Sequence, residues 1–428
     1  MLATFAIYLI MAINSAPSWH LTPDYARDPH ACPYSEQVYH SDEALMRQKA
    51  PTYFRLMTSR YVEIVQAARG YDCSRNAAIA FNGHHYFQAG MSDDPGIAEL
   101  IPAFSSLAGM SLAGAFDLLT FAVIALGLLI GYTGFRRLYP ERSLRLVGAA
   151  VFLCLGLAQA LVADVYIYQI SPLIAGIPWI LHFALSRKSV ALNLSAALLA
   201  FCCSWCSLVR IGTTAICIAF LAVLFIARCR VHKVFLPLLL IVLACVPSIL
   251  FERNLIARRD RFLNGIGQTA TAVNNHPVWH SIYVGLGFVP NSEVTKFSDT
   301  VAMDKVRSVD PTVSYTSERY EIILRREVFE IAVHKPFLLI ENLAAKGAIV
   351  AILAFIVLFP ARRAIFVEKE TRWLDAAFVA AITMSAANIV LVAPKPPYLL
   401  TFICLTFLYS SVKVCGLRSA RIKHASNY

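Results

Sequence analysis

Charged side chains are scarce in this sequence. Only 15% of its 428 residues are Asp, Glu, Lys or Arg, whereas 58% are hydrophobic. A soluble domain carries about 25% charged residues. The apolar residues recur in long runs over the whole length of the chain, which excludes a soluble protein with one membrane anchor. The composition therefore predicts a protein that crosses the membrane many times.

Patterns typical of a zinc site are also missing. Most of the 11 cysteines lie inside apolar runs, where cysteine behaves as a small hydrophobic residue. No Cys-x-x-Cys pair is matched by a second pair or by suitably spaced histidines. Cys32 and Cys73 instead fall in a predicted outer loop, where an oxidising compartment would allow a disulfide between them.

The apolar runs predict an all-α, polytopic helical membrane protein with about ten transmembrane helices, since one crossing takes about 20 apolar residues. The first run also fits a signal peptide, but Pro17 follows the small residues where cleavage would fall, which favours an uncleaved helix. The predicted spans are residues 2–18, 108–134, 146–165, 170–186, 190–208, 211–227, 234–251, 336–360, 374–393 and 397–413.

The distribution of basic residues predicts the orientation of these helices. Every second connection is rich in Lys and Arg, as in the Arg136–Arg145 stretch and in the tail after Lys413. The loop 16–105 differs, with seven basic and ten acidic residues, and the loop 252–335 is nearly balanced. Because short basic loops stay on the cytoplasmic side, we expect both termini to be cytoplasmic. The net charge of +11 then reflects the basic cytoplasmic loops and does not indicate a surface that binds nucleic acid.

The two large extracytoplasmic loops define three parts of the chain. Residues 1–251 form an N-terminal membrane module that includes the outer loop 16–105. Residues 252–335 form the second outer loop, in which 317–334 has the apolar spacing of an amphipathic helix capped by Ser317. Residues 336–428 form the C-terminal membrane helices and a basic cytoplasmic tail.

A small set of charged residues remains inside or beside the spans. By the predicted topology, all of them lie toward the outer ends, where they either reach the interface or face an aqueous cavity. Transporters usually place such groups near the midplane, so this distribution favours an enzyme acting on a lipid-linked substrate at the outer surface. The six residues are Asp117, Asp164, Arg210, Glu341, Lys346 and Lys395.

Four loop carboxylates are candidates for a catalytic base. Asp24 and Asp28 follow the first span, and Asp93 and Asp94 precede Pro95 in the sequence SDDPGI. A positioned carboxylate can accept a proton from a substrate hydroxyl. The alternative is a solvated loop carboxylate for the first pair and helix capping ahead of Pro95 for the second.

Two cations are candidates for binding a phosphate. Arg210 precedes a Gly-Thr-Thr sequence at a predicted outer helix boundary, and its guanidinium can bind phosphate through two parallel hydrogen bonds. Lys395 lies in the proline-rich turn APKPPY. Both residues could equally reach the membrane interface without binding a ligand.

The stretch 274–288 supplies candidates for sugar contact. His276 and His280 have the spacing of ligands on one helical turn, but Pro277 and the later glycines favour a loop, so no metal ligands are assigned. Trp279, His280 and Tyr283 could contact a sugar through ring faces and hydrogen bonds, or could pack the core of the loop.

The sequence HHYFQAGMSDDPGIAELIPAFSSLAGMSL at 84–112 resembles the segment that leads into the second span of GT-C class membrane glycosyltransferases. That class includes protein mannosyltransferases and the aminoarabinose transferases of lipid A. The layout of spans with a large first outer loop is similar as well. The resemblance implies a sugar donor carried on polyprenyl phosphate and a catalytic acidic residue in the first loop, for which Asp24 and Asp28 are the nearest matches.

The expected function is therefore sugar transfer from a polyprenyl-phosphate donor to a glycan, lipid or protein acceptor at the outer face of a bacterial inner membrane. Membrane lipids are expected partners and nucleic acid is not. A divalent metal remains open as a cofactor. The alternatives are an O-antigen ligase or polymerase, which would use outer-loop arginine and histidine, and a transporter or flippase, which the lack of repeats and midplane charges disfavours.

Overall fold

The structure is a computed structural model. It describes residues 67–68, 70, 79–81, 86–88, 95–162, 164–228, 231–268, 277–313, 317–365 and 371–425.

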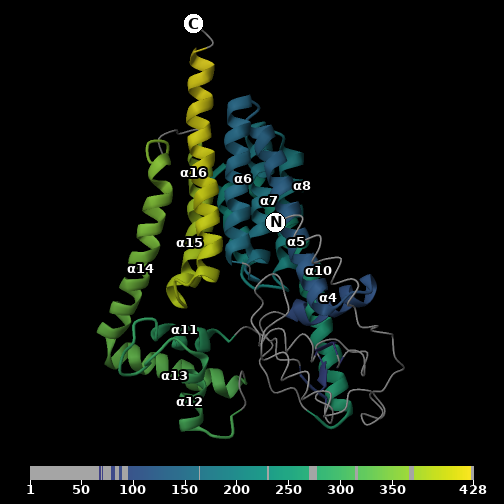
Figure 1. Ribbon diagram of the computed structural model, residues 1–428, viewed down its shortest axis with the longest axis vertical. Helices are drawn as coiled ribbons and strands as arrows, with labels where there is room; N and C mark the ends of the chain where they lie inside the picture. The colour runs from purple at the N-terminus through teal and green to yellow at the C-terminus, as the bar shows by residue number, and fades with distance from the viewer. Residues whose placement is uncertain are drawn as a thin grey trace.

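Helices make up nearly all of the described chain (Figure 1). A short antiparallel pair of strands, β1 (Ile79–Phe81) and β2 (Tyr86–Gln88), is the exception among the described residues. The helices are α4 (Pro95–Ala108), α5 (Leu112–Leu138), α6 (Arg142–Val162), α7 (Ile167–Leu185), α8 (Ser189–Cys206), α9 (Thr213–Arg228), α10 (Val231–Gly265), α11 (Val278–Leu286), α12 (Asp299–Val309), α13 (Glu318–His334), α14 (Pro336–Leu358), the 3-10 turn η2 (Phe359–Ala361), α15 (Arg372–Leu391) and α16 (Pro396–Ala425).

The described residues contain eight helices that are long and apolar enough to cross a membrane: α5, α6, α7, α8, α10, α14, α15 and α16. The protein is therefore a helical, polytopic integral membrane protein. Helix α9 is apolar but shorter, and it corresponds to the predicted span 211–227. The predicted span 2–18 lies outside the described residues. Helix α10 continues to Gly265, beyond the expected end of its span at residue 251.

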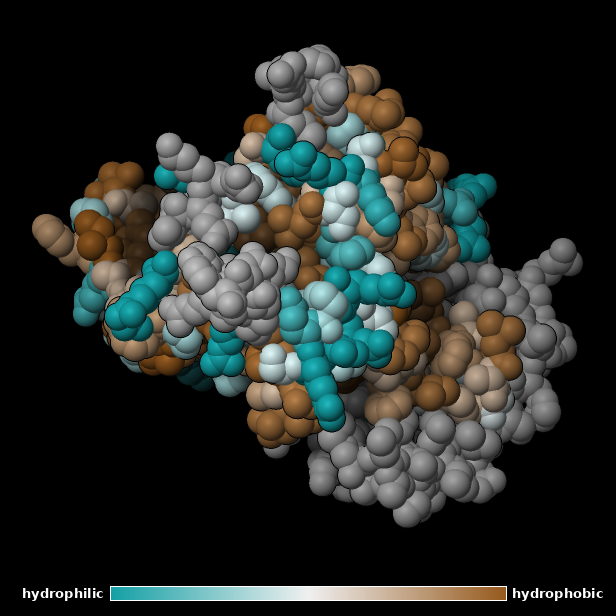
Figure 2. All heavy atoms as spheres, turned by 90° about the horizontal axis from the view of Figure 1, so that it is seen from above, coloured by the Kyte–Doolittle hydropathy of each residue, from teal (hydrophilic) through white to brown (hydrophobic). Residues whose placement is uncertain are grey.

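The two ends of the bundle differ in the helices and side chains that lie there. Helices α4, α11, α12 and α13 lie at one end, called here the loop end, and α16 projects from the opposite tail end (Figure 1). Hydrophilic side chains gather over the tail end, whereas the flanks are largely hydrophobic (Figure 2). The apolar flanks are suited to contact with lipid chains, because a bilayer offers no water to polar groups there.

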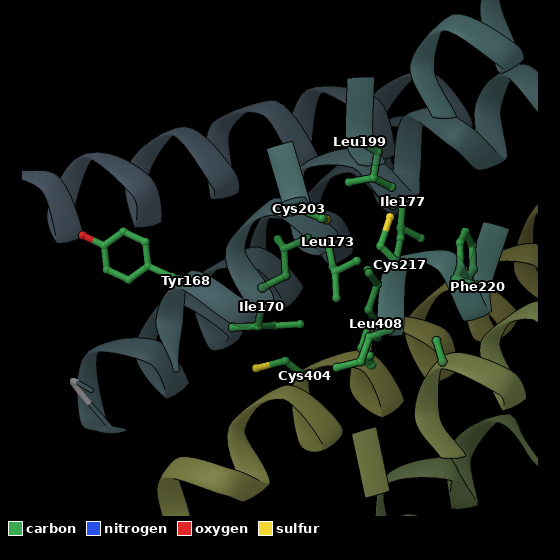
Figure 3. Packing of buried hydrophobic residues seen from close by; sticks show 14 of the residues in the cluster. Tyr168, Ile170, Leu173, Ile177, Leu199, Cys203, Cys217, Phe220, Cys404 and Leu408 are labelled. Carbon is green, nitrogen blue, oxygen red and sulfur yellow. The ribbon is translucent and has the colours of Figure 1, made fainter. Parts of the chain in front are cut away.

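The core of the bundle is built around α7. Its residues Ile170, Leu173 and Ile177 are fully buried, and they meet side chains from α8, α9 and α16 (Figure 3). Helix α5 packs closely along α7, because Gly131 faces the carbonyl oxygen of Ile174 and a Cβ there would collide with it. Small residues let neighbouring membrane helices approach in this way. The core thus fixes the loop-end termini of α7, α8, α9 and α16 relative to one another.

Helices α11, α12 and α13 form a subdomain with its own apolar core at the loop end. The predicted amphipathic helix is confirmed as α13: Ser317 accepts a hydrogen bond from the Tyr320 amide at 3.2 Å, and Tyr320, Ile323 and Leu324 are buried. The expectation of a loop at 277–288 was wrong over 278–286. Pro277 stands at the N-cap position of α11, where its missing amide proton costs nothing, and the helix ends at Gly287.

Candidate functional site

A cluster of polar and aromatic side chains lies at the loop end, around the connection between α8 and α9. Arg210 is part of this connection, and its backbone amide donates to the Cys206 carbonyl at 2.9 Å, continuing the last turn of α8. Gly212 follows with a φ of 104°, a left-handed conformation that glycine adopts without a Cβ clash. The connection therefore turns sharply, and it keeps Arg210 inside the bundle with 6% of the residue exposed.

Arg210 is held against an aromatic pair. Its Nη2 donates a hydrogen bond to the Tyr166 hydroxyl, and its guanidinium carbon lies 4.2 Å from the centre of the Tyr166 ring. The ring of Tyr398, from the first turn of α16, meets Tyr166 edge-on at 5.1 Å. Burial raises the pKa of the Tyr166 phenol well above its usual range, although the charge of Arg210 acts in the opposite direction. Tyr166 therefore stays neutral and leaves the positive charge of Arg210 in place.

A second set of hydrogen bonds fixes the Arg210 connection to α7 and α16. Gln169 Nε2 donates to the Ile211 carbonyl at 3.1 Å, and Thr401 Oγ1 donates to Gln169 Oε1 at 2.8 Å. Gln169 and Thr401 are both buried. The Arg210 cluster, defined as residues 166, 169, 210, 398 and 401, thus brings three separate stretches of the chain together. Such a preorganised cation costs little reorganisation when an anion binds.

Two carboxylates accompany the cluster at the same end. Asp164 lies two residues before Tyr166 in the α6–α7 connection, and its charge contributes to the raised pKa of that phenol. Asp117 is fully buried near the start of α5. Both residues have further interactions. Acidic and basic groups are therefore both present at the loop end of the bundle.

The other predicted phosphate-binding residue, Lys395, makes a different contact. It lies in the connection between α15 and α16, and its Nζ is 3.7 Å from the centre of the Phe297 ring. Phe297 belongs to the α11–α13 subdomain, where it packs against the apolar core. This cation–π contact therefore ties the subdomain to the bundle.

His280 lies within the α11–α13 subdomain with both ring nitrogens engaged. Its Nδ1 is 2.8 Å from the Tyr320 hydroxyl, and its Nε2 is 3.2 Å from Asp299 Oδ1. Glu321 accepts hydrogen bonds from the backbone amides of Trp279 and His280 at 2.9 and 3.0 Å. A carboxylate at that position satisfies amides that the start of α11 cannot pair internally.

The two aromatic residues predicted to contact sugar lie on either side of His280. The Trp279 ring packs 5.4 Å from that of Phe329 on α13. Tyr283 is buried in the subdomain core, where burial and the nearby Glu327 and Glu293 raise the pKa of its phenol to about 12. Tyr283 is therefore placed as a core residue, while Trp279 is partly exposed.

The structure thus joins Arg210 to Tyr166 and Tyr398, and it joins His280 to Trp279 and Tyr283 on one short helix. Sequence reasoning missed Tyr166 and Tyr398, although each lies within three residues of a charge that it did single out, Asp164 and Lys395. Five predicted site residues lie outside the described residues: Asp24, Asp28, Asp93, Asp94 and His276. Within the described ranges, no three His, Cys, Asp or Glu side chains are grouped so as to hold a metal ion.

Comparison of the chain with models of protein families, with curated proteins and with solved structures gave no match.

Proposed function

We propose that the protein is a GT-C-type glycosyltransferase that crosses the membrane ten times, with both termini in the cytoplasm and the loop end facing outward. It takes a sugar from a polyprenyl-phosphate donor and transfers it to an acceptor at the outer face of a bacterial inner membrane. The observation that supports this proposal best is the Arg210 cluster. A buried guanidinium held at the end of a helical bundle suits the phosphate of a lipid whose chain lies in the bilayer.

The proposed reaction is an inverting displacement at the sugar carbon. A carboxylate of the first outer loop, Asp28 or Asp24 before Asp94 or Asp93, removes the proton of an acceptor hydroxyl. The hydroxyl oxygen forms the new bond to the sugar as the bond to the phosphate oxygen breaks, and the polyprenyl phosphate leaves with the electron pair. General base catalysis of this kind contributes about 10²- to 10⁴-fold. Arg210 stabilises the charge that develops on the leaving phosphate.

A second candidate function is that of an O-antigen ligase or polymerase. The contacts of His280 favour it, since Asp299 beside Nε2 orients the imidazole, and Nδ1 would accept the proton once an acceptor hydroxyl takes the place of the Tyr320 hydroxyl. In that reaction His280 would replace the loop carboxylate. Arg210 would keep its role on the phosphate.

A panel of variants separates the two reactions. Asp24→Asn, Asp28→Asn, Asp93→Asn and Asp94→Asn are each assayed for sugar transfer in membranes, beside Arg210→Ala and His280→Ala, with abundance checked for every variant. We expect one acidic variant to lose about 10²-fold or more of the activity while His280→Ala keeps most of it. If all four acidic variants transfer normally and the Arg210 and His280 variants do not, the ligase reaction takes the place of the transferase.

The proposed orientation predicts accessibility to a membrane-impermeant thiol reagent. A cysteine at Thr300, in α12, should react in intact cells, and a cysteine at Ala420, near the end of α16, should react only after the membrane is opened. The basis is the set of basic connections at the tail end, including Arg136, Arg187 and Lys188. Both cysteines are introduced into a cysteine-free background that retains normal abundance. Labelling at position 420 together with protection at position 300 would contradict the orientation.

A further inference from the structure

Helix α13 carries an apolar stripe on each of two opposite faces. Leu324 and Ile331 point into the core of the α11–α13 subdomain and are buried. Ile322, Phe329 and Val333, called here the outer stripe, are 39%, 56% and 71% exposed. With 3.6 residues per turn, the outer stripe covers about 40° of the helix surface and lies about half a turn away from the buried face. A helix whose second face meets water carries polar residues there, so the outer stripe calls for an apolar surrounding.

The outer stripe leads into the lipid-facing side of α14. Lys335 alone separates α13 from α14, and α13 lies across the start of the longer helix (Figure 1). Only 6% of the most apolar stretch of α14 is buried, and Phe337 and Ile340 in its first turns are each more than half exposed. In a bilayer these side chains contact lipid. Val333 stands four residues before Phe337, at most about 14 Å away along the chain.

The length of α14 places its first turn at the edge of the bilayer. Exposed Arg362 and Arg363 mark where the apolar run ends on the tail side. A hydrocarbon layer of about 30 Å takes about 20 residues of an upright helix, which reaches back from Arg362 to about Asn342. The exposed Glu341 comes immediately before it. Phe337 and the end of α13 therefore lie at the height of the lipid headgroups, and a tilt of α14 would bring them deeper.

Trp279 extends the apolar surface from α13 to α11. Its ring packs 5.4 Å from the ring of Phe329, and it is partly exposed. Tryptophan is enriched where membrane proteins cross the headgroup region, because its ring is apolar and its indole N–H is polar. Exposed Arg325 and Glu330 flank the outer stripe on its two sides. A headgroup region suits this pattern, since a narrow apolar stripe can insert while its charged flanks stay hydrated.

We propose that α13 is an interfacial helix whose outer stripe, together with Trp279, inserts into the bilayer surface beside α14. The partner is the lipid bilayer at its headgroup–acyl boundary, and not a second protein chain. Insertion holds the α11–α13 subdomain against the membrane and so fixes the height of His280 above the lipid. The contact goes beyond the proposed sugar transfer and does not rest on it.

Spin labelling of the full-length protein in proteoliposomes tests the contact. Phe329→Cys and Val333→Cys are made in a cysteine-free background of normal abundance, and each carries a nitroxide. Collision rates are measured with oxygen, which concentrates in lipid, and with a water-soluble nickel chelate. The ratio of oxygen to nickel collisions at both positions should be several-fold higher than for Ser308→Cys, an exposed polar site on α12. Ile352→Cys, on the lipid-facing side of α14, gives the value for a label within the bilayer.

Two results would overturn the proposal. If the nickel chelate reaches positions 329 and 333 as readily as position 308, the outer stripe faces water. If both reagents collide rarely at 329 and 333 while oxygen reaches position 352, protein and not lipid covers the stripe. Should either labelled variant fail to reach normal abundance, Ile322→Cys takes its place with the same expectation.

Discussion

Replacing Lys413 with methionine is expected to destabilise the protein by about 3–5 kcal/mol, the usual cost of breaking a buried ion pair from one side. Lys413 Nζ lies 3.0 Å from Asp375 Oδ1, joining α16 to α15 toward the tail end. Asp375 is fully buried, and it also accepts a hydrogen bond from the Tyr409 hydroxyl at 2.7 Å. The variant would leave the carboxylate in the bundle without the charge of Lys413.

The measurement is the free energy of unfolding in detergent, followed by helix content. The double variant Asp375→Leu with Lys413→Met should recover most of the loss, because replacing a whole buried pair with apolar residues is often neutral or stabilising. Arg418→Gln, on the exposed side of the same helix, serves as the control and should stay within about 0.5 kcal/mol of the wild type. A loss in Lys413→Met no larger than that of the control would show that the pair contributes little.

The membrane helices could be predicted from the sequence because a crossing needs one long apolar run, and such runs are local. Their ends were less predictable. Helix α10 extends to Gly265 because Leu255 and Leu263 remain buried beyond the apolar run. Helix α11 was missed because its N-terminal amides are paired by Glu321, more than 40 residues later in the chain. A cap supplied from so far away leaves no local signal next to Pro277.

The candidate site was likewise predictable only where the signal is local in the sequence. Arg210 was predicted because a single arginine next to a helix boundary stands out in an apolar stretch. Its partners were not, because Tyr166 and Tyr398 belong to different connections and meet only after α7 and α16 have packed. Lys346 was noticed as a charge, but its place beside Asn342 on the buried face of α14 was not predicted, for a related reason. A hydropathy average treats Asn342 and Lys346 as two interruptions in one apolar run, and it does not record that both point the same way.

Replacing Arg210 with lysine is expected to lower kcat for sugar transfer by about 10²- to 10³-fold, the range found when one donor to a developing negative charge is removed. Lysine keeps the charge, but its ammonium cannot offer two parallel hydrogen bonds or stack on the Tyr166 ring as a planar guanidinium does. Because the leaving phosphate gains charge only as its bond to the sugar breaks, the loss should appear in kcat more than in KM. Steady-state transfer in proteoliposomes with a polyprenyl-phosphate sugar measures both constants.

Arg326→Lys is the matched control, because Arg326 lies in the α11–α13 subdomain with 80% of its side chain exposed and pairs only with the exposed Glu330 among the described residues. It should transfer sugar at the wild-type rate. Tyr166→Phe retains the ring and removes the hydroxyl that accepts a hydrogen bond from Arg210. Its kcat should lie between those of Arg210→Lys and Arg326→Lys. An Arg210→Lys enzyme with wild-type kcat and a raised KM would assign Arg210 to ground-state binding of the donor, because only contacts that strengthen in the transition state raise kcat.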